Sequence, residues 1–171
     1  DIQHSFYHAV SAQHIEASLN EKGNIEAYLH RTAFSPIMST FQEGASAPGG
    51  FELDLGFTDN PILAPNMKLE RGEAPAKARI GWMRSVTNIF HAFAVQSFIN
   101  EAAHKAGKDS KDYLLETIGP ARTIDFANQN ANYNNYGGDK AVYPLETSRL
   151  RHVIEKAASM ANWGRTLPKG R

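Results

Sequence analysis

Residues 15–29 read Ile-Glu-Ala-Ser-Leu-Asn-Glu-Lys-Gly-Asn-Ile-Glu-Ala-Tyr-Leu, and this stretch decides the fold. Apolar and polar side chains alternate in both halves of it, which is the period of a strand with one buried face. The polar Asn-Glu-Lys-Gly-Asn run between the halves is typical of a turn. The stretch therefore predicts a β-hairpin, whose second strand continues towards Phe34 and whose first strand residues 5–12 could lengthen.

A helix is predicted over residues 87–106, where apolar side chains recur at the three- and four-residue spacing of one helical face. Gly107 follows this pattern as a typical helix end. The first half of the helix, residues 89–95, is apolar on nearly every side, so we expect other elements to enclose it. Two further helices are predicted, over residues 110–118 and 147–164.

The segments between these elements are rich in residues that break regular structure. Residues 35–56 contain Pro, Gly, Ser and Ala and predict a long surface loop, whereas residues 67–70 alternate like a further strand. The Asn-rich run 128–138 predicts a flexible loop. We therefore expect an α+β fold, with an antiparallel sheet covered by two or three helices, among them 87–106 and the C-terminal helix.

The composition is that of one ordinary globular domain of 171 residues. Lys+Arg and Asp+Glu both number 18, and a net charge of zero argues against a strong binder of nucleic acid or anionic membranes. The chain has no cysteine, which excludes disulfides, thiolate metal sites, iron-sulfur ligation and a cysteine nucleophile within it. No run of 18 apolar residues predicts a membrane span.

The residues that point to chemistry stand directly before the long helix, in Gly81-Trp82-Met83-Arg84-Ser85-Val86-Thr87-Asn88. Gly81 permits close approach to a ligand, Arg84 is a permanent cation, and Ser85, Thr87 or Asn88 could cap the helix. No carboxylate occurs between Glu73 and Glu101, so a bound phosphate or pyrophosphate could supply the negative charge that a helix start favours. In the alternative, Arg84 pairs with a core carboxylate and Ser85 is an ordinary cap.

The same stretch resembles a known enzyme family. The run 81–86, the helix sequence His-Ala-Phe-Ala-Val-Gln-Ser-Phe-Ile-Asn-Glu at 91–101 and the Ala-Gly-Lys-Asp turn at 106–109 are similar to the molybdopterin-binding large subunit of the xanthine dehydrogenase and aldehyde oxidase family. Within that family, the sequence most resembles the beta subunit of isoquinoline 1-oxidoreductase. The segment Phe6-Tyr7-His8 and the hairpin end at 27–31 also resemble the family, so the likeness covers about residues 4–118 and, more weakly, the helix 147–164.

The resemblance implies a molybdenum hydroxylase, which oxidises an aldehyde or N-heterocycle with oxygen from water and passes electrons to a small iron-sulfur subunit. It implies a molybdopterin cofactor, as a dinucleotide in bacteria, near Gly81, Trp82, Met83, Arg84 and Ser85. It also implies that residues 1–171 are an internal piece of a larger subunit, a single domain that is inactive without the remaining segments. A periplasmic location is implied in the same way, although nothing in the sequence decides the compartment.

The chain also departs from the family pattern. The family's catalytic Glu and upstream glycine-rich loop are not visible, so no catalytic residue is expected here. Thr87-Asn88-Ile89-Phe90 replaces the small residues expected after the Arg-Ser-Val turn. Two alternatives therefore stay open: a non-catalytic structural or interaction module that keeps the fold without the cofactor, and an independent binder of a small anion.

Weaker candidates lie elsewhere in the chain. His4, His8 and His14 could form a metal site only if folding brings them together. His91 is expected to be a hydrogen-bonded core or pocket-lining histidine. Asp54, Glu70 and Glu73 could form a carboxylate pair on the same condition.

Overall fold

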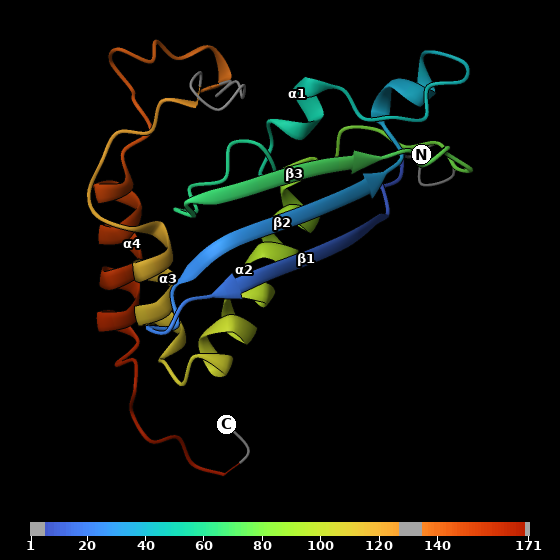
Figure 1. Cartoon of the computed structure of the whole chain (residues 1–171). Coiled ribbons are helices and arrows are strands. Elements are labelled where there is room, and N and C mark those ends of the chain that lie inside the picture. The colour runs from blue at the N-terminus through green and yellow to red at the C-terminus, as the bar shows by residue number, and fades with distance from the viewer. Residues whose placement is uncertain (1–5, 127–134, 170–171) are drawn as a thin grey trace.

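The computed structural model describes residues 6–126 and 135–169 and contains one three-stranded sheet (Figure 1). The strands, in the sheet order β1-β2-β3, are β1 (Ser11–Leu19), β2 (Ile25–Phe34) and β3 (Asn66–Gly72). The helices and 3-10 turns are η2 (Ile37–Thr40), α1 (Gly50–Leu53), α2 (Asn88–Lys105), α3 (Ser110–Ile118), η4 (Asn135–Gly137) and α4 (Thr147–Met160). The predicted α+β class is confirmed.

The predicted hairpin is formed by β1 and β2, which pair antiparallel. Along β1, half-buried and exposed residues alternate, as the sequence pattern requires. The turn is closed by the side chain of Asn20, whose Oδ1 accepts from the backbone N–H groups of Lys22 and Asn24. Gly23 has a φ of +77° and lies against Ala106, where an added Cβ would approach the Ala106 Cβ to 2.9 Å. A larger residue at this position would therefore push the turn away from the end of α2.

The third strand corrects the prediction of a wholly antiparallel sheet. β3 pairs parallel to β2, with Tyr28 opposite Met67 and His30 opposite Leu69. Two parallel neighbours need a crossover that returns the chain to the starting edge, and residues 35–65 provide it. The sheet is therefore mixed, with β2 in the centre.

Residues 35–56 are not the surface loop that their composition predicts. They contain η2 and α1, and the side chains of Ile37, Glu52 and Leu55 are buried. The fully buried carboxylate of Glu52 accepts from the backbone N–H groups of Ile37 (2.7 Å) and Gly49 (3.4 Å). This single side chain satisfies donors that an irregular segment would otherwise leave unpaired, so the crossover can be partly buried.

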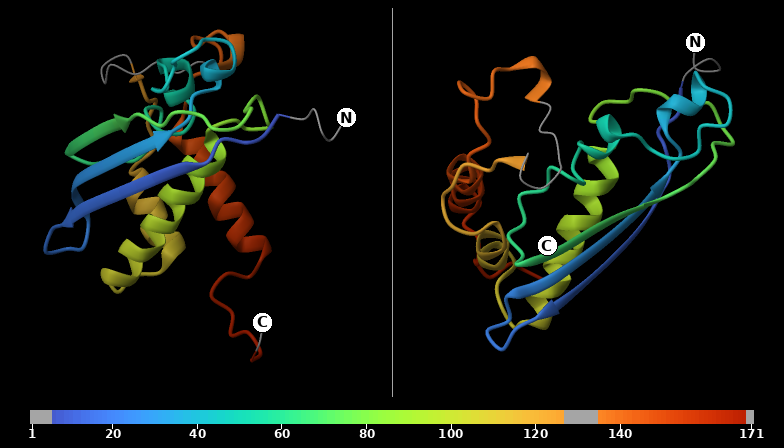
Figure 2. Two further views of the ribbon diagram at one scale, coloured as in Figure 1. Left: turned by 90° about the vertical axis from the view of Figure 1, so that its right-hand side faces the viewer. Right: turned by 45° about the horizontal axis from the view of Figure 1, so that its top comes forward.

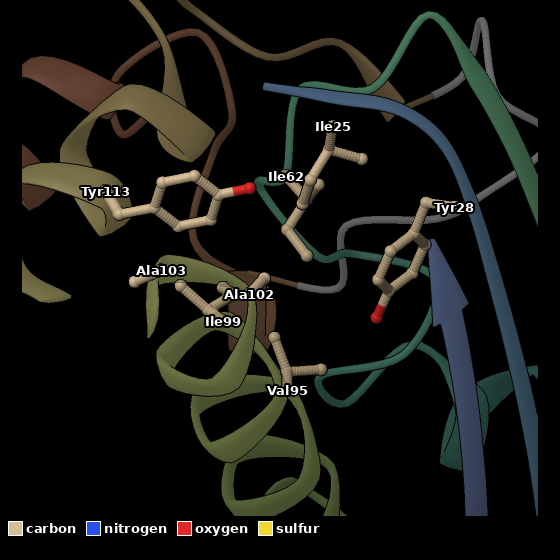
Figure 3. Close-up of a cluster of buried hydrophobic side chains, with 8 residues drawn as sticks. All are labelled: Ile25, Tyr28, Ile62, Val95, Ile99, Ala102, Ala103 and Tyr113. Carbon is tan, nitrogen blue, oxygen red and sulfur yellow. The ribbon is translucent and has the colours of Figure 1, made fainter. Parts of the chain in front are cut away.

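The main core lies between the hairpin, α2 and α3 (Figure 3). One face of α2 supplies four of its residues at the predicted helical spacing, and the predicted glycine end of α2 is present at Gly107. Tyr113 of α3 reaches across to donate to the carbonyl of Gly23 at 2.9 Å. The core side chains are Ile25, Tyr28, Ile62, Val95, Ile99, Ala102, Ala103 and Tyr113.

Two expectations about the helices are wrong. The C-terminal helix, α4, packs on α3 and not on the sheet (Figure 1). The first half of α2 is also not enclosed, since Ile89 and Phe93 are 47% and 75% exposed. The sheet covers only one side of this helix, as Figure 2 shows, and an apolar sequence buries a side only where another element lies against it.

Most of the predicted loop 128–138 lies outside the described residues, which stop at 126 and resume at 135. Asn135 to Gly137 form the short turn η4.

Candidate functional site

Residues 81–88, called the 81–88 segment below, connect an isolated parallel bridge between Tyr7 and Ile80 to the first turn of α2. The segment folds as successive tight turns. Its backbone hydrogen bonds run from Met83 N–H to Gly81 O (3.0 Å), from Val86 N–H to Met83 O (2.9 Å) and from Asn88 N–H to Ser85 O (2.9 Å).

Two consecutive residues of the segment have left-handed backbone conformations. The φ angle is +67° at Ser85 and +46° at Val86. Such angles are unusual for any residue other than glycine, and a β-branched side chain such as that of Val86 makes them a clear outlier. Each costs about 1–3 kcal/mol and persists only where the surroundings impose it, which occurs most often at functional sites.

Arg84 and Ser85 form an exposed tip of the segment. Within residues 6–126 and 135–169, Arg84 has no ion-pair partner, and the backbone N–H groups of Arg84 and Ser85 have no protein acceptor. The alternative in which Arg84 pairs with a core carboxylate is thus not found in this part of the chain. A guanidinium beside unengaged N–H groups is a donor set that suits an anion.

The adjoining helix start strengthens this positive character. α2 has no acidic residue in its first turn and no side-chain cap. Thr87 is the N-cap residue, but its hydroxyl donates to the carbonyls of Glu52 (2.6 Å) and Leu55 (3.3 Å). The prediction of a Ser85, Thr87 or Asn88 side-chain cap is therefore wrong. The positive end of the helix dipole is left without a compensating side chain.

Trp82 and Met83 give the segment an apolar side. Trp82 is 60% exposed, and its ring lies 5.5 Å from that of Phe41, which follows η2 and is itself exposed. Met83 is also exposed. The 81–88 segment thus presents an aromatic and thioether surface beside a cation, a combination that suits a planar ligand carrying a negatively charged group.

Gly81 has a different environment from its neighbours. It is buried, and an added Cβ would come within 2.9 Å of the Cβ and Cγ atoms of Phe6. The close approach that requires a glycine here is made by Phe6 of the same chain. A contact between Gly81 and a cofactor stays a prediction.

A network of hydrogen-bonded polar side chains, called the polar network below, links α2 to the sheet. His91 contacts the carbonyl of Leu55 through Nδ1 (3.1 Å) and the hydroxyl of Thr32 through Nε2 (3.1 Å). Gln13 extends the polar network. Its amide N–H donates to the Thr32 hydroxyl (2.7 Å), and its Oε1 contacts Nε2 of His30 (2.7 Å). The expectation of a hydrogen-bonded core histidine at position 91 is confirmed.

Both histidines of this polar network, His30 and His91, are neutral at pH 7. Burial lowers the pKa of His91 to about 4, and burial together with the nearby His91 lowers the pKa of His30 to about 4. Phe57 packs against both rings, with centroid separations of 4.8 Å to His30 and 5.4 Å to His91. The polar network therefore acts as a fixed support for the first turn of α2 and not as an acid or base.

The weaker candidates are dispersed. His4 lies outside the described residues, His8 contacts the carbonyl of Val86 and His14 contacts Glu16. No group of three metal-ligating side chains occurs in residues 6–126 and 135–169.

The three candidate carboxylates are also separately engaged. Asp54 accepts from Thr58, Glu73 from Ser46, and Glu70 pairs with Arg31 and Lys68. They form no pair.

Parts of the chain are similar in sequence to two known dehydrogenases. The chain is 28% identical over 123 residues to a subunit of the nicotinate dehydrogenase of Pseudomonas putida, a match that covers 68% of the chain and 10% of that protein. It is 30% identical over 92 residues to the membrane-bound, pyrroloquinoline-quinone aldehyde dehydrogenase of Gluconacetobacter polyoxogenes, covering 53% of the chain and 10% of that protein. No family model matches the chain.

These relatives confirm the predicted resemblance at the level of dehydrogenases, but not at the level of the isoquinoline 1-oxidoreductase branch. The matched part is about a tenth of the length of either relative. In the described residues no helix is long and apolar enough to cross a membrane.

Sequence reasoning missed three residues that shape the site: Phe41 beside Trp82, Glu52 inside the crossover and His8 on Val86. Phe41 and Glu52 lie in the segment that its composition marked as a loop. His8 was noted only for a metal site and for the family resemblance. The available sign of a buried acceptor was the presence of acidic residues, Glu43, Glu52 and Asp54, within a Gly- and Pro-rich run, because such a run leaves many backbone donors unpaired.

Proposed function

We propose that the chain is part of a molybdenum hydroxylase, in which the 81–88 segment lies against a molybdopterin dinucleotide cofactor. The observation that carries the proposal is the exposed donor set of Arg84 and Ser85, held in a strained turn at a helix start without acidic residues. A pyrophosphate or phosphate group fits such a donor set in charge and in hydrogen-bonding capacity.

In this proposal, the residues of the 81–88 segment and its supports have three different roles. The Arg84 guanidinium and the N–H groups of residues 84 and 85 would bind the anionic part of the cofactor. Trp82 and Met83 would exclude water from one side of it. Thr87 and His91, which anchor the first turn of α2 to the crossover, would hold these groups in position.

The bound cofactor supplies the redox chemistry, the transfer of a water-derived oxygen to an electron-poor carbon, and the protein supplies position and charge. The two relatives support the expected substrate classes, since one is named for nicotinate, an N-heterocycle, and the other for aldehydes. A small iron-sulfur subunit as electron acceptor, and further segments of the same large subunit as the remainder of the site, complete the proposal.

The second relative is named for pyrroloquinoline quinone, which is also a planar anionic cofactor. The test must therefore identify the cofactor as well as detect it. The complete gene product is purified together with its iron-sulfur partner, and molybdenum is measured by elemental analysis, the pterin by its fluorescent oxidation product and the quinone by mass spectrometry.

The decisive comparison uses Arg84→Ala beside Arg149→Ala, which removes an exposed arginine from the distant helix α4. Loss of a charge-assisted hydrogen bond predicts roughly a tenfold fall in cofactor retention for Arg84→Ala and no fall for the control. A folded protein that contains quinone in place of molybdenum refutes the molybdopterin proposal. A folded protein with neither cofactor supports the alternative of a non-catalytic structural module.

A further inference from the structure

The short segment Phe6-Tyr7-His8 contacts the 81–88 segment at both of its ends. At the first end, Tyr7 pairs with residues on either side of Ile80, through hydrogen bonds from Tyr7 N–H to Arg79 O (2.9 Å) and from Gly81 N–H to Tyr7 O (3.2 Å). Phe6 packs directly on Gly81. At the far end, Nε2 of His8 lies 3.0 Å from the carbonyl oxygen of Val86.

The contact at Val86 falls on one of the two strained residues. A carbonyl oxygen can only accept, so Nε2 of His8 carries the proton and donates it. The ring of His8 is also fixed, because it packs edge-on against Phe90 with a centroid separation of 5.7 Å. The donor therefore has a set position, and Val86 accepts from it while in the left-handed conformation.

We propose that His8 is a positioning residue for the 81–88 segment: its ring N–H holds Val86 in the left-handed conformation that presents Arg84 and Ser85 as an anion-binding tip. The inference rests on the proposed function for the identity of the ligand, but the constraint on the backbone is independent of it. His8 touches no reacting group in this scheme and acts only through Val86.

Two substitutions separate the hydrogen bond from the packing. His8→Phe keeps a ring against Phe90 and removes the donor, whereas His8→Gln places an amide N–H close to the position of Nε2. Backbone hydrogen exchange of the complete protein, followed by mass spectrometry, reports on the turn, because the N–H groups of Val86 and Asn88 are protected only while the turn is formed.

We expect exchange in residues 83–90 to accelerate at least fivefold in His8→Phe and to stay within twofold of the parent in His8→Gln. Exchange in α3 should be unchanged in both variants, which shows that the effect is local. Cofactor content should fall severalfold in His8→Phe and recover in His8→Gln.

A third variant tests the mechanism through Val86 itself. Asn tolerates left-handed angles better than Val, so the double variant His8→Phe/Val86→Asn should regain much of the protection that His8→Phe loses. A purely structural role for the ring at position 8 would not respond to this change.

The outcomes distinguish this inference from the proposed function. Unchanged exchange in His8→Phe, or equal acceleration in His8→Phe and His8→Gln, overturns the positioning role of His8. Faster exchange in His8→Phe combined with normal cofactor content in Arg84→Ala keeps the positioning role and refutes the proposed ligand.

Discussion

Thr32 on the central strand donates its hydroxyl proton to Nε2 of His91, one turn inside α2, over 3.1 Å. The direction of this hydrogen bond follows from the other nitrogen of the ring. Nδ1 faces the carbonyl of Leu55, which can only accept, so in the neutral ring Nδ1 carries the proton and Nε2 is the acceptor.

The same reasoning assigns the donor and the acceptor in the other hydrogen bonds of the polar network. The Thr32 oxygen accepts from the amide of Gln13, whose own oxygen accepts from Nε2–H of His30. Nδ1 of His30 is then left to accept from the hydroxyl of Tyr28, at 3.4 Å. Each hydrogen bond of the network can run in only one direction, so the loss of any one side chain leaves a neighbouring donor or acceptor without its partner.

Acid should destabilise the fold through His30 and His91. In the unfolded chain each ring takes up a proton near pH 6.5, but in the folded protein only near pH 4, because burial disfavours the charged form. The unfolded state therefore binds more protons between these values, and the free energy of unfolding falls as the pH is lowered from 6.5 to 4. Each histidine contributes up to about 3 kcal/mol to this loss.

Urea denaturation at pH 4.5 and pH 7.5 measures this loss as a shift of the midpoint. His152→Gln, which changes an exposed histidine of α4, should leave the pH dependence as it is. Burial also raises the pKa of Asp59 to about 6, so its protonation stabilises the fold in the same pH range and offsets part of the loss. Equal midpoints at the two pH values in an Asp59→Asn variant would therefore contradict the assignment of neutral, buried rings.

Thr32→Val should destabilise the protein although it preserves the shape of the side chain. Nε2 of His91 loses its donor and the amide of Gln13 loses its acceptor, at a cost of about 1–3 kcal/mol. Thr32→Ser keeps the hydroxyl and should recover more than half of the loss. Chemical denaturation of the three proteins provides the comparison, and a fully stable Thr32→Val protein would show that the chain of hydrogen bonds is dispensable.

The two sides of α2 should respond very differently to truncation. Ile99 is 3% exposed and belongs to the core, so Ile99→Ala should cost about 2–5 kcal/mol. Phe93 lies on the open side, and Phe93→Ala should change the free energy of unfolding by less than about 0.5 kcal/mol. A large loss for Phe93→Ala in the isolated chain would mean that the open side is covered in solution.

Gly81→Ala separates a packing role from a ligand role. If Phe6 is the reason for the glycine, the added methyl group clashes with it and lowers the free energy of unfolding by about 1–3 kcal/mol. Gly50→Ala meets open space and serves as the matched control. Unchanged stability in Gly81→Ala together with reduced cofactor content would assign the glycine to the ligand instead.

The sequence predicted well those elements whose burial repeats regularly along the chain. The hairpin and α2 each bury one side, and their periodicity shows this directly. The direction of β3 was not predictable, because a strand reads the same in parallel and antiparallel pairs and only the path of the crossover decides.

The site divides in a similar way. The 81–88 segment was recognisable from its residue types and its place before a helix. The left-handed angles of Ser85 and Val86 were not, because they are imposed by tertiary contacts against the preference of the residues themselves. His8 and Glu52 act on parts of the chain distant from them in sequence, and single-sequence patterns carry no record of such pairs.

The hydrogen bond between His8 and Val86 spans 78 positions of the chain. The hairpin needs only local contacts and can form early. The contacts between residues 6–8 and the 81–88 segment, in contrast, require the closure of a very long loop. The exposed tip formed by Arg84 and Ser85, the proposed anion site, is consequently among the last features that folding completes. Cofactor insertion would then be a late event in maturation, available only to a chain whose two distant parts have already met.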